Sequence, residues 1–244
     1  MHKLFDAFAH RYDLHTPPDH YQHDHQLVLE LARERGPACR VLDIGCGTGV
    51  LVQKALEAGF DAYGLDASDA MVAAARQRVP LERVRAQRMQ NLDDLDRYDL
   101  IVSTSWSIHY CADEADLFDI LRRIRRALVQ RGTVLLQVAH RPNLREEWCE
   151  DLEAGPGGVP EDVSLRFRFR RDEAVPDGLL ADYAYRCKSN GEALQETHIL
   201  RVVDATSVAR LARDAGFLNV QTWGAKRLES LGSRGTGWVI GHLP

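Results

Sequence analysis

The chain has 244 residues, of which 45% are hydrophobic, and a formal net charge of −5. This length suits one α/β domain with an insertion better than two independent domains. The acidic balance gives no general attraction to nucleic acid or anionic membranes, so we expect a small-molecule partner. The five scattered cysteines contain no C-x-x-C pair, which argues against a zinc site or a disulfide framework. The sequence shows no export signal or long apolar run, and we expect a cytoplasmic protein.

The N-terminal stretch predicts a short helix. Phe5, Phe8 and Tyr12 recur at positions i, i+3 and i+7, which places them on one helical face over something apolar. Two prolines follow, and we expect Asp19 to cap the next helix, which continues to about residue 35.

Four histidines near this helix start suggest a metal site as one hypothesis, namely His15, His20, His23 and His25. No downstream His or Cys pair completes such a site. We therefore favour a solvated helix start and predict no metal.

Residues 41–49 read V-L-D-I-G-C-G-T-G, which predicts a buried strand that ends in a glycine-rich turn. A helical pattern begins at Val50, so a helix N-terminus faces the same turn. The glycine spacing is G-x-G-x-G, whereas a dinucleotide-binding turn has G-x-G-x-x-G. A nicotinamide oxidoreductase is therefore disfavoured. The remaining structural alternative is a glycine turn that only packs a helix on a sheet.

Two acidic residues lie close to this turn in the predicted fold. Asp43 stands two positions before the first glycine, where it would repel a pyrophosphate and can hold a cationic amine. Asp66 ends the next predicted strand, 62–65, and is placed to accept both hydroxyls of a ribose. The ligand that offers an amine, a carboxylate and a ribose diol without phosphate is S-adenosylmethionine.

The next predicted elements alternate between strand and helix. We expect a helix over 68–76 with Ser68 as its cap, strands over 83–89 and 98–103, an amphipathic helix over 113–128, and a strand over 132–138. The loop 104–111 follows the fourth strand. Such loops face the ligand crevice of doubly wound sheets.

Residues 139–203 interrupt this alternation and predict an antiparallel cap over the pocket, with a hairpin whose turn is at 189–191. Residues 165–171 alternate Phe and Arg. Their arginines can bind a phosphate or RNA, but we favour the solvated face of a strand whose Phe167 and Phe169 point inward. A helix over 206–215 and a strand pair at 218–223 and 236–241 complete the chain.

Together, these motifs resemble the class I S-adenosylmethionine-dependent methyltransferases, in particular the group that acts on amino sugars and glycine. The resemblance rests on V-L-D-I-G-C-G-T-G, G-L-D-A-S, Y-D-L-I-V-S, S-I-H-Y and A-L-V-Q-R-G-T-V-L-L, in family order over residues 1–140. It implies an α/β fold with a doubly wound, seven-stranded, mostly parallel Rossmann-like sheet whose last strand is antiparallel. An inserted antiparallel β cap and an N-terminal helical lid are added to it.

The resemblance also implies a single domain with four parts. These are N-terminal lid helices (1–35), a cofactor-binding core (36–138), the inserted cap (139–203) and a C-terminal helix and strand pair (204–244).

The cofactor-binding residues that the resemblance implies, beside the two aspartates, are Tyr12, Tyr21, Gly45, Gly47, Ala67, Met71, Asn91, Leu92 and Ser103. Tyr12 belongs to the lid, and aromatic core packing is its alternative role. Asn91 replaces the aspartate that bonds the adenine amino group in the family, and its amide oxygen can accept the same bond. Gln90 and the Leu92 backbone are the other candidates for this contact.

The acceptor side is expected at Trp106, His109, Tyr110 and Arg141. His109 matches a histidine of the small-molecule enzymes and can act as a general base near neutral pH. Its alternative role is a bond to the backbone of the loop. Tyr12 is the second candidate for proton transfer.

We therefore expect an enzyme that transfers a methyl group from S-adenosylmethionine to N or O of a small molecule, with S-adenosylhomocysteine as the product. A carbon acceptor stays open, as do monomer and homodimer. The rival hypotheses are an RNA or protein methyltransferase and a non-catalytic S-adenosylmethionine-binding subunit.

Overall fold

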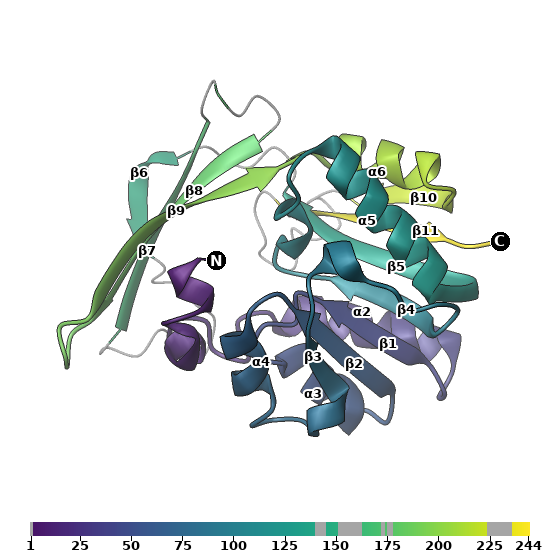
Figure 1. Cartoon of the computed structure of the whole chain (residues 1–244), viewed down its shortest axis with the longest axis horizontal. Helices are drawn as coiled ribbons and strands as arrows, with labels where there is room; N and C mark the ends of the chain where they lie inside the picture. The colour runs from purple at the N-terminus through teal and green to yellow at the C-terminus, as the bar shows by residue number, and fades with distance from the viewer. Residues whose placement is uncertain (1, 140–144, 151–162, 172–173, 175–177, 224–235) are drawn as a thin grey trace.

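The computed structural model describes residues 2–139, 145–150, 163–171, 174, 178–223 and 236–244. Seven strands of this part form one sheet in the order β10-β11-β5-β4-β1-β2-β3 (Figure 1). Their bounds are Arg40–Ile44 (β1), Asp61–Asp66 (β2), Val84–Ala86 (β3), Tyr98–Ser103 (β4), Leu128–Ala139 (β5), Leu218–Trp223 (β10) and Thr236–His242 (β11).

The pairing of these strands confirms the predicted topology. Neighbouring strands from β3 to β5 run parallel. Strand β11 runs antiparallel to both β5 and β10. The last strand of the chain is therefore the antiparallel one, and the carboxyl ends of β1, β2 and β4 meet at one edge of the sheet.

Helices cover both faces of this sheet. Helices α5 (Glu114–Ala127) and α6 (Ala205–Asp214) pack on one face with Leu42 and Ile44 of β1. Helices α2 (Gln22–Arg35), α3 (Val50–Glu57) and α4 (Asp69–Ala75) pack with Val41 on the other. Strand β1 thus buries side chains on both faces, as a central parallel strand does. None of the helices in the described ranges is long and apolar enough to cross a membrane.

Side-chain caps fix the starts of three helices. Ser68 accepts a hydrogen bond from the Met71 N–H at 3.1 Å, as predicted, and Asp113 and Asp204 cap α5 and α6 in the same way. The prediction for Asp19 is wrong, because α2 begins at Gln22 with Tyr21 at its N-cap position. The carboxylate of Asp19 contacts the Lys54 ammonium instead.

The N-terminal segment is not the single helix that its aromatic spacing predicts. It forms 3₁₀ turns at Lys3–Phe5 and Ala9–Arg11, followed by the short helix α1 (Tyr12–His15). The conformation of this segment fits the surface of the inserted cap, because Leu4, Phe5 and Phe8 pack against apolar residues of the cap. This tertiary contact outweighs the local periodicity.

The insertion forms a second, antiparallel sheet in the order β6-β7-β8-β9. In Figure 1 this cap sheet stands beside the main sheet, with the N-terminal segment between them. Its strands are β6 (Arg145–Glu150), β7 (Val163–Arg170), β8 (Gly178–Cys187) and β9 (Ala193–Arg201), and β8 and β9 form the predicted hairpin.

Two arginines of β7, Arg168 and Arg170, are paired with an acidic residue, whereas Arg166 is exposed, as the predicted solvated face requires. The guanidinium groups of Arg168 and Arg170 both donate to the buried carboxylate of Asp182 on β8, each at 2.7 Å. These bonds hold the pKa of Asp182 well below its usual range. Both arginines therefore stabilise the cap, and neither is a candidate phosphate ligand.

Candidate active site

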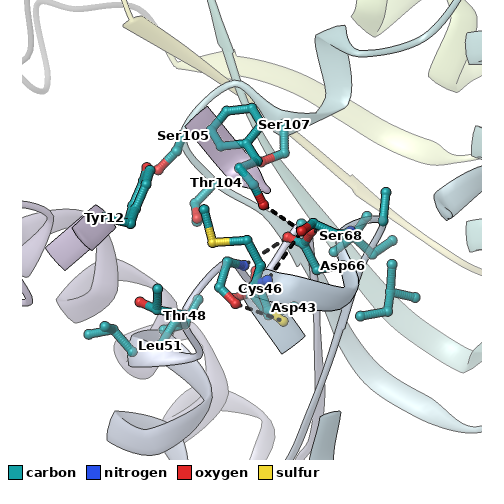
Figure 2. Close-up of a pocket in the computed structure, with 18 of the residues that line it drawn as sticks. Tyr12, Asp43, Cys46, Thr48, Leu51, Asp66, Ser68, Thr104, Ser105 and Ser107 are labelled. Atoms are coloured by element: carbon teal, nitrogen blue, oxygen red, sulfur yellow. Dashed lines mark hydrogen bonds between the residues drawn. The ribbon is translucent and has the colours of Figure 1, made fainter. Parts of the chain in front are cut away.

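A cavity of about 430 Å³ lies between the carboxyl ends of β1, β2 and β4 and the N-terminal segment. Figure 2 shows Tyr12 across this cavity from Asp66 and Ser68. The predicted site residues that line it are Tyr12, Tyr21, Asp43, Gly45, Gly47, Asp66, Ala67, Met71 and Tyr110. A volume of this size accommodates a small-molecule ligand. Arg141 lies outside the described residues.

Asp66 ends β2 at the floor of the cavity. Its carboxylate accepts hydrogen bonds from the backbone N–H groups of Gly47 and Ser68, both at 2.9 Å. Burial raises the pKa of this carboxyl, while these backbone bonds act in the opposite direction. The carboxylate is thus fixed in place, and each of its oxygens can still accept a hydroxyl of a ribose.

Asp43 lies on β1, the strand next to β2, and the residue is 2% exposed. Burial raises its pKa to about 7, and the charge of Asp66 adds to this rise. Its Oδ1 atom has no hydrogen-bond partner among the residues that the structure describes. A buried carboxylate oxygen without a partner is costly. A cationic amine in the cavity would satisfy it, which agrees with the predicted role.

The glycine turn brings bare backbone to this cavity. Gly45 has a φ of +76°, and a Cβ atom there would lie 2.6 Å from the Cβ and Oγ atoms of Ser107. Only glycine fits both the conformation and the space. The turn and the loop after β4 therefore pack directly against each other at the site.

The residues expected to contact adenine are placed differently from the prediction. Residues 87–90 line the cavity, whereas Asn91 is exposed and Leu92 belongs to the core under α5. The reason is that β3 ends at Ala86, three residues before its predicted end, so the chain turns along the cavity earlier. Of the predicted candidates for the adenine contact, Gln90 is the one at the cavity.

Two more predicted residues lie outside the cavity lining. The hydroxyl of Ser103 is fully buried and donates to the Ile44 carbonyl at 3.1 Å, which ties β4 to β1. Trp106 packs against Phe169 of the cap, with ring centroids 5.3 Å apart. Both residues support the walls of the site.

His109 is also outside the lining, and its geometry contradicts the predicted role as a base. Its Nδ1–H donates to the Arg201 carbonyl, and its Nε2 accepts from the Ala139 N–H, both at 2.9 Å. Complete burial lowers its pKa to about 4. Both ring nitrogens are therefore committed to the backbone, which is the alternative that the sequence left open.

Sequence reasoning missed a buried network behind the loop after β4. Ser105 and Trp106 both have a positive φ, 52° and 60°, a conformation that costs non-glycine residues free energy. The Ser105 N–H donates to Gln137 of β5 at 2.5 Å, and the Gln137 amide donates to the buried carboxylate of Asp24 at 2.8 Å. This network holds the strained loop beside the cavity. Its residues carry no motif that would have revealed it.

The N-terminal segment is fastened over the cavity by Asp13. Its carboxylate accepts a hydrogen bond from the Thr48 hydroxyl of the glycine turn at 2.7 Å and forms an ion pair with Arg78. The Ser68 hydroxyl also donates to the Phe5 carbonyl. Tyr12, next to Asp13, is thereby held at the cavity wall.

The histidines near the start of α2 do not form a cluster. In the described part of the chain, the group of potential metal ligands that lie within 4.8 Å of one another is instead His2, Glu196 and His198. His15 and His25 are buried, and burial lowers the pKa of each to about 4.

Comparisons with known proteins identify the family. Residues 41–132 match a family described as "Methyltransferase domain". The glycine/sarcosine N-methyltransferase of Halorhodospira halochloris is 31% identical over 204 residues, which cover 81% of this chain and 72% of that enzyme. Together with the glycine turn and its two carboxylates, this similarity shows that the chain belongs to the S-adenosylmethionine-dependent methyltransferases.

Two further similarities are with enzymes of amino-sugar chemistry. The dTDP-4-amino-2,3,4,6-tetradeoxy-D-glucose N,N-dimethyltransferase of Saccharopolyspora spinosa is 26% identical and aligns with 56% of this chain and 61% of its own length. The structure of the sugar N-methyltransferase KedS8 of a Streptoalloteichus species superposes with a TM-score of 0.70 at 24% identity, over 90% of this chain and 86% of that one. The latter shows a shared fold.

The residues present fit S-adenosylmethionine. Asp66 would accept the ribose hydroxyls, Asp43 would accept the ammonium group, and residues 87–90 with Met71 would surround the adenine. The chemistry that the bound cofactor supplies is a methyl group on a sulfonium sulfur.

Proposed function

We propose that the protein methylates an amine or hydroxyl of a small acceptor, with an amino sugar or a small amino acid as the first class to test. The observation that carries this proposal is the size of the cavity and the segment that covers part of it. Its described wall comes from the sheet edge and from the N-terminal segment that Asp13 fastens. A cavity of about 430 Å³ has room for a cofactor and a small partner, whereas an RNA or a protein needs an open surface.

The main task of the protein in this reaction is alignment and exclusion of water. Orientation of this kind can lower a barrier by roughly 7 to 11 kcal/mol. Asp43 and Asp66 would fix the cofactor at one side, while Tyr12 and Tyr110 line other walls of the cavity. The names of the similar enzymes, which act on amino sugars and on glycine, support an amine acceptor.

We also propose that the cap acts on the cavity indirectly. Among the described residues, the cavity lining has none from the cap; instead, cap residues pack behind Leu4, Phe5 and Phe8. The cap would thus support the segment that closes the site.

The proposal is tested with methyl-labelled S-adenosylmethionine and a panel of acceptors. The panel contains dTDP-4-amino-2,3,4,6-tetradeoxy-D-glucose, glycine and sarcosine, together with bulk RNA and a protein mixture. We expect label in one of the small molecules and none in either macromolecule. The Asp43→Asn variant lacks the side-chain carboxylate that we propose to bind the ammonium group of the cofactor. It serves as the inactive control. Transfer to RNA or protein alone would contradict the proposal.

A further inference from the structure

A chain of three hydrogen-bonded side chains leads from the cavity into the cap. Tyr110 lines the cavity, and its hydroxyl lies 2.6 Å from Nδ1 of His198 on β9. Nε2 of His198 lies 2.7 Å from Oε1 of Glu196. His198 is fully buried, so this chain is shielded from solvent at its centre.

The direction of the hydrogen bonds follows from the chemistry of the groups. Glu196 accepts the backbone N–H groups of Lys3 and Leu4, each at 2.9 Å. Burial acts to raise its pKa, but these bonds and that from His198 lower the pKa overall. An ionised carboxylate only accepts hydrogen bonds, so Nε2 of His198 must carry the proton. Nδ1 is then a bare acceptor, and the Tyr110 hydroxyl donates to it.

We infer that Tyr110, His198 and Glu196 form a proton relay that takes the acceptor's proton during methyl transfer. In this relay Tyr110 is the catalytic residue, because it is the member of the chain that lines the cavity. His198 and Glu196 act through it as positioning residues. The inference rests on the proposed function in requiring an acceptor that carries an N–H or O–H proton.

The proton and electron balance of the step is complete without a further reactant. The acceptor's lone pair forms the bond to the methyl carbon, and the carbon–sulfur bond breaks with its electrons on sulfur. The acceptor's proton moves to Oη of Tyr110 while the phenol's own proton moves to Nδ1 of His198. The positive charge lost at sulfur thus reappears as an imidazolium beside the Glu196 carboxylate.

The groups around His198 agree with a proton that is held only transiently. Its ring stacks on His2 at 3.7 Å and contacts Tyr183 at 4.8 Å, in addition to the contacts with Tyr110 and Glu196. Burial and the neighbouring His2 lower the pKa of His198 to about 4, although Glu196 opposes this change. His198 is therefore neutral before the reaction and returns its proton readily afterwards.

The same geometry argues against a metal at His2, Glu196 and His198. The two imidazole rings are stacked, with an angle of 25° between their planes. Because ring lone pairs lie in the ring plane, stacked rings do not direct them at a common point between the planes. The hydrogen-bonded chain also already uses both nitrogens of His198.

The first test needs no acceptor. Nitrogen-15 NMR of histidine side chains in the protein with S-adenosylhomocysteine reports the tautomer of His198. We expect the proton on Nε2 and a shift of the Nδ1 signal in Tyr110→Phe. Little change is expected in Tyr183→Phe, which removes a hydroxyl but keeps the ring that packs on His198. A proton on Nδ1 would reverse the chain and overturn the relay.

The second test measures turnover with dTDP-4-amino-2,3,4,6-tetradeoxy-D-glucose and with glycine. His198→Gln can keep both hydrogen bonds but cannot take a proton, so we expect kcat to fall about 100-fold with the affinity for S-adenosylhomocysteine unchanged. The pH dependence of kcat should change as well, and Tyr183→Phe should behave as the unaltered protein does. An unchanged kcat in His198→Gln, or turnover abolished by EDTA, would overturn the relay.

If neither acceptor is methylated, that result counts against the proposed acceptor class, and the NMR test decides on the relay.

Discussion

The carboxylate of Asp66 accepts a hydrogen bond from the Gly47 N–H at 2.9 Å, which joins the end of β2 to the glycine turn after β1. The two segments that we propose to hold the cofactor are therefore joined directly to each other. The bond also explains why a carboxylate that is largely buried keeps a fixed direction toward the cavity.

Replacement of Asp66 by alanine should weaken cofactor binding. The variant loses two charge-assisted bonds to the ribose, and we expect a loss of about 2 to 4 kcal/mol in the binding free energy of S-adenosylhomocysteine. Calorimetric titration measures it. Asp61→Ala, at the other end of the same strand, is the control and should bind normally. An affinity unchanged by Asp66→Ala would remove this residue from the site.

Asp43 should make the free protein less stable as the pH rises. Its folded pKa of about 7 lies above the ordinary value of 3.8, so the folded state binds more protons than the unfolded state between these values. The contribution of Asp43 to the free energy of unfolding therefore falls as the pH rises from 4 to 7. Asp43→Asn does not titrate, and its stability relative to the unaltered protein should rise over this range by up to about 4 kcal/mol.

Thermal unfolding at pH 5 and pH 8 without cofactor measures this effect. The expected result is a Tm advantage of Asp43→Asn that is larger at pH 8. A Tm difference that is the same at both values would show that Asp43 has an ordinary pKa.

Loss of the Asp13 contacts should open the cavity. Asp13→Asn removes the ion pair with Arg78 and weakens the hydrogen bond from Thr48. We expect these lost contacts to cost about 1 to 2 kcal/mol of the free energy that keeps the segment in place. This loss corresponds to roughly 5- to 30-fold faster release of S-adenosylhomocysteine. Stopped-flow displacement measures the dissociation rate. Asp6→Asn, an exposed position of the same segment, should leave that rate unchanged. Equal rates for both variants would mean that Asp13 does not hold the segment closed.

His109 should matter for stability. His109→Phe leaves the Arg201 carbonyl and the Ala139 N–H without their partner, and we expect a loss of about 2 to 4 kcal/mol in the free energy of unfolding at pH 7. A histidine with a lowered folded pKa stabilises the fold fully above about pH 6.5 and loses that contribution as the pH falls toward 4. The difference between the two proteins should therefore shrink over that range.

Urea unfolding at pH 7 and pH 5 checks this prediction, with His10→Phe at an exposed position as the control. If His109→Phe were as stable as the unaltered protein but lost turnover, the residue would be a base after all.

The sequence predicted the parts of the fold that local pattern controls. Glycine spacing, buried strands and helix caps located the sheet, and the two carboxylates followed from their places at the ends of β1 and β2. Strand ends were predicted less well: β3 stops at Ala86, three residues before its predicted end, and residues 87–90 line the cavity in place of Asn91 and Leu92. The prediction of a single N-terminal helix was wrong because the conformation of this segment depends on its packing against the cap.

The hydrogen-bond partners of His109 and Tyr110 could not be predicted because distant segments supply them. His109 and Tyr110 are neighbours in the sequence, yet His109 bonds to backbone and Tyr110 faces the cavity. The partner of Tyr110 is His198, 88 residues further along the chain. No periodicity relates these positions, and only the register of the cap strands brings them together.

The measurement that tests the central claim most directly is calorimetric titration of the purified protein with S-adenosylhomocysteine, with NADH as the comparison ligand. The site of Asp43, Gly47 and Asp66 predicts one binding site for S-adenosylhomocysteine and no binding of NADH. Binding of NADH instead, or of neither ligand, would contradict the assignment of this cavity to the methyl-donating cofactor.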